Sequence, residues 1–363
     1  MIRLKIDNIN IEVDQGLTLL DAAIKAGIHI PTLCHRNGLE HYSSCMVCIV
    51  KNKGTNGYVP SCSALALEGM DIDASGDDVR ELRKKAVELL LSEHRAECEA
   101  PCRIVCPAGY NIPVMNRFIM SGEIERAIEL ARTEVTTPII MCVSCPGYCE
   151  NACRRKKIDQ SVSIRNIQLF VSRSINKNGS SGSIINQSVK DTLKHNRAKE
   201  INPVRKRFNS RTGRIDDKEL KEWLKECTGP VERKREIGDF TVAGIEAGNC
   251  MHCDCRASDS CKLRSIAEEF KVKDPTGKIV NAPIEKKINK NTGLIFENAK
   301  CIKCGLCVRV CEDSKDEPSL CFIHRGFISV ISEPLTEEFD NILKTKTDIC
   351  KEICPTGALS RIK

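Results

Sequence analysis

The chain has 363 residues, 23 of them cysteine, and a formal net charge of +7. This length allows two or three compact domains. No apolar run approaches the ~20 residues that span a bilayer, and an aromatic content of 4% offers few rings for stacking nucleic-acid bases. We therefore expect a soluble protein with no membrane span and no nucleic-acid partner. The positive charge says little about partners, because a cluster held by four thiolates carries about −2, and four or five clusters bring the total to roughly zero.

Most of the cysteines fall into groups in which pairs are separated by two residues, a spacing that lets one loop supply several thiolates to a metal centre. A disulfide framework is the other interpretation, and three features argue against it. The N-terminal sequence MIRLKIDNIN has no signal-peptide pattern, the cysteine count is odd, and the chain is long enough to form cores without crosslinks. We therefore expect bound metal in a reducing, cytoplasmic compartment.

The N-terminal segment, residues 1–78, is predicted to be rich in β-structure. Ile2–Ile6 and Ile9–Val13 alternate apolar and polar residues on either side of a turn, which predicts a hairpin. Leu17–Ala26 has helical periodicity and ends at Gly27. Four cysteines follow this helix: Cys34, Cys45, Cys48 and Cys62.

The sequences IPTLC and SCMVC, in this order of elements, resemble the β-grasp [2Fe–2S] domain at the front of the large iron–sulfur subunit of respiratory complex I and of related hydrogenase and formate dehydrogenase subunits. The resemblance implies one [2Fe–2S] cluster on Cys34, Cys45, Cys48 and Cys62. His35 and His41 lie in the same loop and raise a Rieske-type alternative, although four cysteines make histidine ligands redundant.

Residues 79–175 are predicted to form a helical domain. Asp77 and Asp78 can cap a helix from Val79 to His94, and a further helix is expected over Val114–Ala131. The stretches CEAPCRIVCPAGYNIP and CVSCPGYCENAC resemble the helical N-terminal domain of the glutamate synthase small subunit and of dihydropyrimidine dehydrogenase. That domain carries two [4Fe–4S] clusters, so the resemblance implies two clusters here.

Carried over by position, the resemblance implies two interleaved ligand sets. The first is Cys98, Cys102 and Cys153, with His94 as the nearest candidate for the fourth place; a capping or surface role is the alternative for this histidine. The second is Cys106, Cys145 and Cys149, with Gln168 where dihydropyrimidine dehydrogenase has a glutamine and with Cys142 as its competitor. Replacing a thiolate by a neutral ligand makes a cluster easier to reduce.

Residues 176–245 are predicted to be a linker or a docking segment. Asn176–Asn186 is rich in Gly, Ser and Asn, and the stretch that follows is highly charged, with one short amphipathic helix over Leu220, Trp223 and Leu224. Cys227 lies alone and is expected to be structural. No GxGxxG follows a predicted strand, so no flavin or nucleotide site is expected.

Residues 246–363 are predicted to form a C-terminal ferredoxin-like iron–sulfur domain. Its run of three cysteines at intervals of two is typical of bacterial ferredoxins, and the fourth ligand of such a cluster is a remote cysteine before proline. This predicts a [4Fe–4S] cluster on Cys301, Cys304, Cys307 and Cys354. Three cysteines within residues 301–363 lie outside this set: Cys311, Cys321 and Cys350. A further cluster that they form with His324 is the alternative to leaving them unliganded.

A second cluster is expected at the start of this segment, on Cys250, Cys253, Cys255 and Cys261, which are too closely spaced for two zinc ions. The sequence CMHCDCR, followed by CKLR, resembles the tail of flavin-dependent oxidoreductases related to the glutamate synthase subunit. KCIKCGLCVRVC, RGFISV and CKEICPTGAL resemble the ferredoxin-like region shared by those tails and by hydrogenase and formate dehydrogenase modules.

Together these patterns predict a multidomain α+β protein with one [2Fe–2S] and four [4Fe–4S] clusters. No nucleophile–base arrangement or phosphate loop is visible, so no catalytic residues are expected. The predicted function is electron transfer within a multi-subunit, NAD(P)H-linked or electron-bifurcating oxidoreductase of hydrogenase, transhydrogenase or formate dehydrogenase type. The expected partners are an NADH-binding flavoprotein subunit like that of complex I and a catalytic subunit. A cluster-assembly carrier and an oxidoreductase with an unrecognised substrate site are the alternatives.

Overall fold

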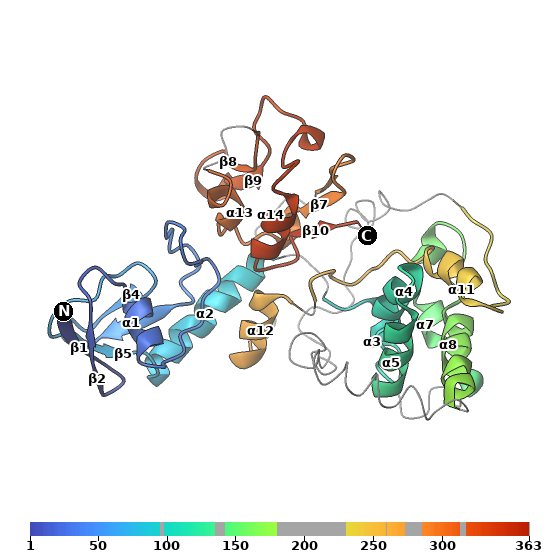
Figure 1. Ribbon diagram of the computed structural model, residues 1–363, viewed down its shortest axis with the longest axis horizontal. Helices are drawn as coiled ribbons and strands as arrows, with labels where there is room; N and C mark the ends of the chain where they lie inside the picture. Colours follow the sequence, from blue (N-terminus) through green and yellow to red (C-terminus); the bar gives the residue numbers. More distant parts are fainter. Residues whose placement is uncertain are drawn as a thin grey trace. The chain divides into compact units, whose positions relative to one another are not determined.

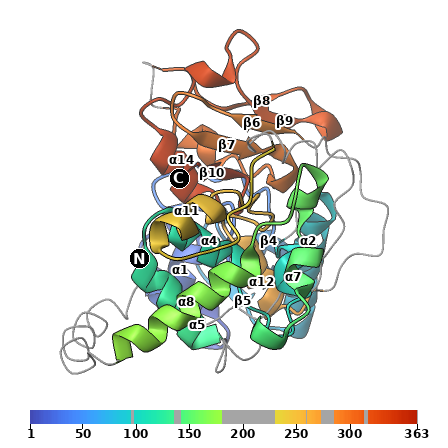
Figure 2. The ribbon, with the colours of Figure 1, turned by 90° about the vertical axis from the view of Figure 1, so that its right-hand side faces the viewer.

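In a computed structural model, the chain is described over residues 1–94, 98–134, 142–179, 230–258, 260–272, 285–312 and 317–362. It forms two compact units (Figures 1 and 2). The first unit is Met1–Ala96 with Ser260–Lys363, and the second unit is Glu97–Asp259. This differs from the predicted division, because residues 246–258 belong to the second unit and the two ends of the chain share the first. Within the described ranges, no helix has both the length and the apolar character needed to cross a membrane.

The first unit begins with a five-stranded mixed sheet, as expected of a β-grasp domain. Its strands lie in the order β2-β1-β5-β3-β4 and comprise Ile9–Val13, Ile2–Ile6, Asp71–Asp73, Ile49–Asn52 and Gly57–Pro60. β1 pairs antiparallel with β2 and parallel with β5. The predicted hairpin is confirmed, and Asp7 and Asn8 both have positive φ, which the favoured two-residue hairpin turns use.

One helix, α1 (Leu19–Lys25), packs on this sheet where the periodicity predicted Leu17–Ala26. Thr18 and Asp21 form a capping box at its N-terminus, and the backbone turns away at Gly27, whose φ is +72°. The buried face of α1 joins Ile6 and Ile72 in one core. This core supports the loops that carry the first four cysteines.

α2 (Asp77–Glu93) leads out of this sheet. It begins two residues before the predicted start, with Gly76 as its N-cap, so Asp77 and Asp78 lie in the first turn, where carboxylates favour the helix dipole. The buried Arg83 donates from Nε to the carbonyl oxygen of Ile49 in β3 (3.0 Å). α12 (Lys262–Glu269) packs against α2, so the C-terminal part of the chain returns to the first unit.

The C-terminal part of the first unit contains two small sheets and short helices. One sheet has the order β10-β7-β6 (Leu359–Arg361, Leu294–Glu297 and Lys286–Ile288), and the other pairs β8 (Cys321–Ile323) with β9 (Val330–Ser332). The helical segments are η3 (Asn298–Lys300), α13 (Leu306–Arg309), η4 (Gly326–Ile328), η5 (Phe339–Asn341) and α14 (Thr347–Ile353). Their shared core contains apolar side chains and cysteine side chains, so the cysteines are part of the packing.

The second unit is helical. Its elements are α3 (Pro101–Ile104), α4 (Ile112–Met120), α5 (Ile124–Glu134), α7 (Tyr148–Asn151), η1 (Arg154–Lys157), α8 (Ile164–Gly179) and α11 (Phe240–Ala247). The single helix predicted over Val114–Ala131 is wrong: the chain turns at Gly122, whose φ is +75°, and α4 and α5 pack against each other. Each of the two helices buries one apolar face, so the sequence on both sides of the turn has helical periodicity and reads as one helix.

The predicted linker is only partly described. Residues 180–229, with Leu220, Trp223, Leu224 and Cys227, lie outside the described residues. The end of the predicted segment is packed, because α11 contacts α4 and α8 in the second unit (Figure 1). Arg233 is buried as well, so a solvated linker does not extend to residue 245.

Candidate iron–sulfur sites

The first cysteine group lies beside the β-grasp sheet. Cys34, Cys45, Cys48 and Cys62 are all buried in the first unit. Side-chain hydrogen bonds with Cys45 and Cys62 lower the pKa of the Cys34 thiol, and a hydrogen bond with Cys62 lowers the pKa of Cys48 to about 7. The same hydrogen bonds raise the pKa of the Cys45 and Cys62 thiols, so the four side chains form one hydrogen-bonded group. The structure therefore brings all four predicted ligands together.

The two histidines of this loop contact each other. Nδ1 of His35 lies 3.2 Å from Nδ1 of His41, and Nε2 of His35 lies 2.9 Å from Oδ1 of Asn37. Burial, with repulsion from His35 and Arg309, lowers the pKa of His41. A ligand role for these histidines is thus not needed to explain their placement.

The second group lines a small cavity in the C-terminal part of the first unit. Cys301, Cys304, Cys307 and Cys354 face it together with apolar side chains that include Phe296 and Leu359. Burial raises the pKa of Cys301 and of Cys304 to about 12. Repulsion from the neighbouring thiolates adds to this effect at Cys307. The four predicted ligands again converge, in surroundings that exclude water.

Arg309 of α13 connects the loops of these two groups. Its guanidinium Nη2 donates to the carbonyl oxygens of Cys34 (2.9 Å) and Cys304 (3.0 Å), and Nη1 donates to the carbonyl oxygen of Glu40. The guanidinium also stacks on the ring of Tyr42, 4.4 Å from its centroid. The side chain is only 2% exposed. Sequence reasoning missed this residue because nothing local marks an arginine as a bridge to a loop 275 positions away.

The third group lines a cavity of about 210 Å³ in the second unit. Cys106, Cys145, Cys149 and Gln168, the predicted ligands, all face it, and so does the competing Cys142. The Cys142 thiol donates to Oε1 of Gln168 (3.1 Å). Burial, with repulsion from Cys106 and Cys145, raises the pKa of Cys142 to about 11. More possible ligands thus surround this site than the four that a cubane would need.

A fourth group differs from both sets predicted for its members. Cys102 and Cys153 line a second, smaller cavity in the second unit, and Cys250 and Cys253 line the same cavity. The predicted companions of Cys102 and Cys153 were His94 and Cys98, and those of Cys250 and Cys253 were Cys255 and Cys261. None of these four residues lines the cavity.

The remaining predicted ligands are distributed over both units. In the first unit, Nδ1 of His94 lies 2.9 Å from the carbonyl oxygen of Lys300, and the Cys261 thiol lies 3.7 Å from the carbonyl oxygen of Pro355. In the second unit, the backbone N–H of Cys255 donates to the carbonyl oxygen of Cys98 (3.4 Å). His94 is buried, so a surface role for it is wrong.

The cysteines that the sequence left over include one close pair. The sulfurs of Cys311 and Cys350 lie 3.4 Å apart in the core of the first unit. Cys321 lies in β8 and is half-buried, and His324 is exposed. The exposed histidine and the pairing of two buried thiols favour a packing role over the alternative of a further cluster.

Comparison with known proteins identifies two domains. Residues 1–76 match the 2Fe-2S iron-sulfur cluster binding domain, and residues 83–180 match dihydropyrimidine dehydrogenase domain II, described as a 4Fe-4S cluster domain. The α+β architecture has a likeness to a solved NAD⁺-reducing [NiFe]-hydrogenase in the H₂-reduced state, with a TM-score of 0.50 and 15% identity over 99% of this chain and 87% of that one.

Several relatives are components of larger enzymes. One component of the NADH-quinone oxidoreductase of Rhizobium meliloti is 35% identical over 27% of this chain and 12% of its own length. The HndD component of the NADP-reducing hydrogenase of Solidesulfovibrio fructosivorans is 38% identical over 27% of this chain and 18% of its own length. The gamma chain of the NAD-reducing hydrogenase HoxS of Cupriavidus necator is 26% identical over 40% of this chain and 62% of its own length. The chain thus spans less than two thirds of the length of these relatives. It combines a [2Fe–2S] domain with a dihydropyrimidine dehydrogenase-type [4Fe–4S] domain, and it is similar to subunits of NADH- and NADPH-linked oxidoreductases.

Proposed function

We propose that this chain is a non-catalytic electron-transfer subunit of a multi-subunit, NAD(P)H-linked oxidoreductase of hydrogenase, transhydrogenase or formate dehydrogenase type. It would relay electrons between a flavoprotein subunit and a catalytic subunit. Its similarity to subunits of such enzymes supports this role. When bound, iron–sulfur clusters accept and release single electrons at potentials set by their ligands, hydrogen bonds and burial.

Three ligand sets of the sequence analysis are part of the proposal. A [2Fe–2S] cluster would be held by Cys34, Cys45, Cys48 and Cys62, and a [4Fe–4S] cluster by Cys301, Cys304, Cys307 and Cys354 in a ferredoxin-like C-terminal part. A further [4Fe–4S] cluster would use Cys106, Cys145, Cys149 and Gln168. The convergence of each set on one place in the structure supports these assignments.

The observation that carries the electron-transfer role is the contact made by Arg309. A buried guanidinium that donates to both Cys34 and Cys304 keeps the two ligand loops next to each other. Electron transfer between two centres needs this proximity and a rigid connection. A chain that only stored or delivered clusters would not need to hold two of its sites together with a buried charge, which is costly to desolvate.

The experiment is anaerobic purification of the full chain with quantification of iron and EPR of the reduced protein. The three clusters named here require about 10 iron atoms per chain, and the five clusters predicted from the sequence require about 18. Rapid mixing with reduced methyl viologen should then reduce both the [2Fe–2S] cluster and the C-terminal [4Fe–4S] cluster. The EPR signals of the two reduced clusters should appear with a shared time course. Iron that a chelator removes readily would favour an assembly carrier, and flavin or nucleotide bound by the chain would favour an enzyme.

A further inference from the structure

The fourth cysteine group joins parts of the chain that are far apart in sequence. Cys102 lies in α3 and Cys153 precedes η1, whereas Cys250 and Cys253 come directly after α11. All four face one small cavity, whose other walls include apolar side chains such as Ile112, Val162 and Ile164. Two cysteines of the matched helical domain thus meet a Cys-x2-Cys pair that lies outside the matched residues.

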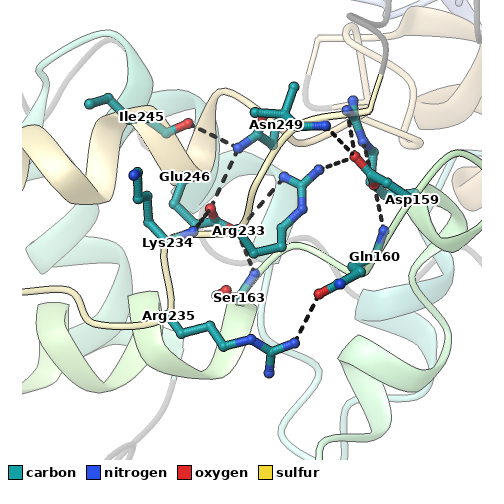
Figure 3. A network of polar contacts seen from close by, with 11 residues as sticks. Asp159, Gln160, Ser163, Arg233, Lys234, Arg235, Ile245, Glu246 and Asn249 are labelled. Atoms are coloured by element: carbon teal, nitrogen blue, oxygen red, sulfur yellow. Dashed lines mark hydrogen bonds and ion pairs between the residues drawn. The ribbon is translucent and has the colours of Figure 1, made fainter.

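A polar network anchors the segment that brings in this pair (Figure 3). Glu246, a residue of α11 with no exposed surface, accepts hydrogen bonds from the backbone N–H groups of Ser163 and Lys234, each at 2.8 Å. Arg233 forms an ion pair with Asp159, which also pairs with Arg155 (3.1 Å). The end of α11, just before Cys250, is therefore fixed against the loop that follows Cys153.

A second anchor lies on the other side of the Cys-x2-Cys pair. Arg117 of α4 forms a bidentate pair with Asp254, at 2.8 and 2.6 Å. The Asp254 side chain is almost fully buried, and paired planar contacts of this kind restrict orientation. Because Asp254 is next to Cys253, the placement of the pair is determined by packing on both sides.

Burial disfavours the free thiolate at all four of these cysteines. Burial, with repulsion from Cys250, Cys253 and Cys153, raises the pKa of Cys102 well above its ordinary value. Burial likewise raises the pKa of Cys250 to about 11, although the amide of Asn116 opposes this. Coordination to a metal centre offsets the cost of burying a thiolate, because the charge of the metal stabilises the deprotonated form.

Asn116 supplies an independent observation. Its side chain has no exposed surface, and among the described residues neither amide atom has a nitrogen or oxygen hydrogen-bond partner. A buried amide that lacks such partners destabilises the fold unless another group accepts its hydrogen bond. Since the amide lies close enough to Cys250 to lower its pKa, a thiolate or sulfide in this cavity would be its natural acceptor.

We propose that Cys102, Cys153, Cys250 and Cys253 together hold one [4Fe–4S] cluster, with Asn116 as a positioning residue that donates a hydrogen bond to a sulfur of that cluster. A zinc ion would draw four sulfurs to about 3.8 Å from one another, whereas a cubane places one iron under each sulfur and needs wider spacing. In the described ranges, no three Cys, His, Asp or Glu side chains are arranged for a single metal ion.

This ligand set replaces two sets predicted from the sequence. It takes Cys102 and Cys153 from one predicted set and Cys250 and Cys253 from the other. A fourth [4Fe–4S] cluster would therefore require a further ligand set. Cys98, Cys255 and Cys261 are the cysteines of the two predicted sets that the proposed set leaves out. The site would hold its cluster whether or not the chain passes electrons to a partner.

The test is the additivity of iron loss in the full chain, reconstituted anaerobically with ⁵⁷Fe and sulfide. Cys153→Ala and Cys250→Ala should each lose about four iron atoms, and the double variant should lose the same four. A loss of about eight in the double variant would place the two residues in different clusters and overturn the proposal. Cys350→Ala, a buried cysteine outside every proposed set, is the matched control and should lose none.

Serine variants provide a readout that does not need cluster loss. Cys102→Ser and Cys253→Ser keep a ligating oxygen, so both should shift the EPR spectrum of the same cluster. Shifts in two different spectra, or one zinc per chain in place of iron, would contradict the proposal. Asn116→Leu should keep the iron content and lower the reduction potential of that cluster, because a lost hydrogen bond destabilises the reduced form. An unchanged potential would remove Asn116 from the proposal.

Discussion

Nη2 of Arg309 lies 2.9 Å from the carbonyl oxygen of Cys34, although the two residues are separated by 275 positions in the chain. The same nitrogen donates to the carbonyl oxygen of Cys304 (3.0 Å). Two proposed cluster sites, one in the β-grasp part and one in the C-terminal part, thus share one buried cation. Their relative placement depends on a side chain that ligates neither cluster.

Replacing Arg309 by leucine should therefore loosen the first unit. The carbonyl oxygens of Cys34, Glu40 and Cys304 would each lose a donor, at a cost of about 3 kcal/mol or more in the free energy of unfolding. Denaturant unfolding of the full chain would measure this loss. Rapid-mixing EPR should also show slower equilibration between the [2Fe–2S] cluster and the C-terminal cluster.

Two variants make the Arg309 experiment specific. Arg309→Lys keeps the charge but not the planar fork, so it should recover only part of the stability. Arg325→Leu removes an exposed arginine of the same unit and should change stability by less than about 0.5 kcal/mol. Equal effects of Arg309→Leu and Arg325→Leu would show that the bridge has no structural role.

Gln168 and Cys142 both face the cavity of the third group, and two variants can show which of them is the fourth ligand. If Gln168 is the fourth ligand, Gln168→Cys would add a thiolate and make the cluster more negative, so its reduction potential should fall. Cys142→Ala should leave both the iron content and the potential unchanged. Redox titration followed by EPR measures both variants, and a loss of about four iron atoms in Cys142→Ala would instead make Cys142 the ligand.

The pair formed by Cys311 and Cys350 is expected to stabilise the core without binding iron. Cys350→Ala leaves a small cavity in a fully buried place, at a cost of about 1 kcal/mol. Its iron content should equal that of the unmodified chain, whereas Cys354→Ala should lose about four iron atoms. Iron analysis together with thermal unfolding separates the two roles, and iron loss in Cys350→Ala would restore the idea of a further cluster.

Asp159 should stabilise the second unit over a wide pH range. A hydrogen bond from Arg155, helped by Arg233, holds the pKa of this carboxyl well below its ordinary value. A depressed pKa adds stability above the unfolded value, about 3.9, and this stability is lost only as the pH falls through the folded value. The difference in unfolding free energy between the unmodified chain and Asp159→Asn should therefore be constant between pH 5 and pH 8, a range that begins roughly one unit above the unfolded pKa of the carboxyl.

The size of that difference follows from the two arginines. Asp159→Asn removes the carboxylate that pairs with Arg155 and Arg233, two buried arginines, while the longer ion pair of Arg233 with Glu246 (3.9 Å) stays. The loss should cost about 3 kcal/mol. Urea unfolding at several pH values measures it. Asp340→Asn, which alters an aspartate of the first unit, serves as the control. A difference that disappears already at about pH 5 would contradict the depressed pKa.

The sequence alone determined the features that depend on neighbours along the chain. The hairpin of β1 and β2, the helix α1 and the ferredoxin-type run at Cys301, Cys304 and Cys307 follow from alternation, periodicity and spacing, which are local properties. The spacing by two residues also predicted that cysteine side chains would converge, because one loop can then present two of them to the same place.

Only the tertiary structure decided which remote cysteines meet. Cys250 and Cys253 were expected beside Cys255 and Cys261, their neighbours in sequence, but the contacts of Glu246 and Arg117 direct them toward Cys102 and Cys153. The bridge from Arg309 to Cys34 is of the same kind. The physical reason is that a ligand set closes through packing between distant segments, and the ion pairs and buried amides that determine such packing leave no periodic mark in the sequence.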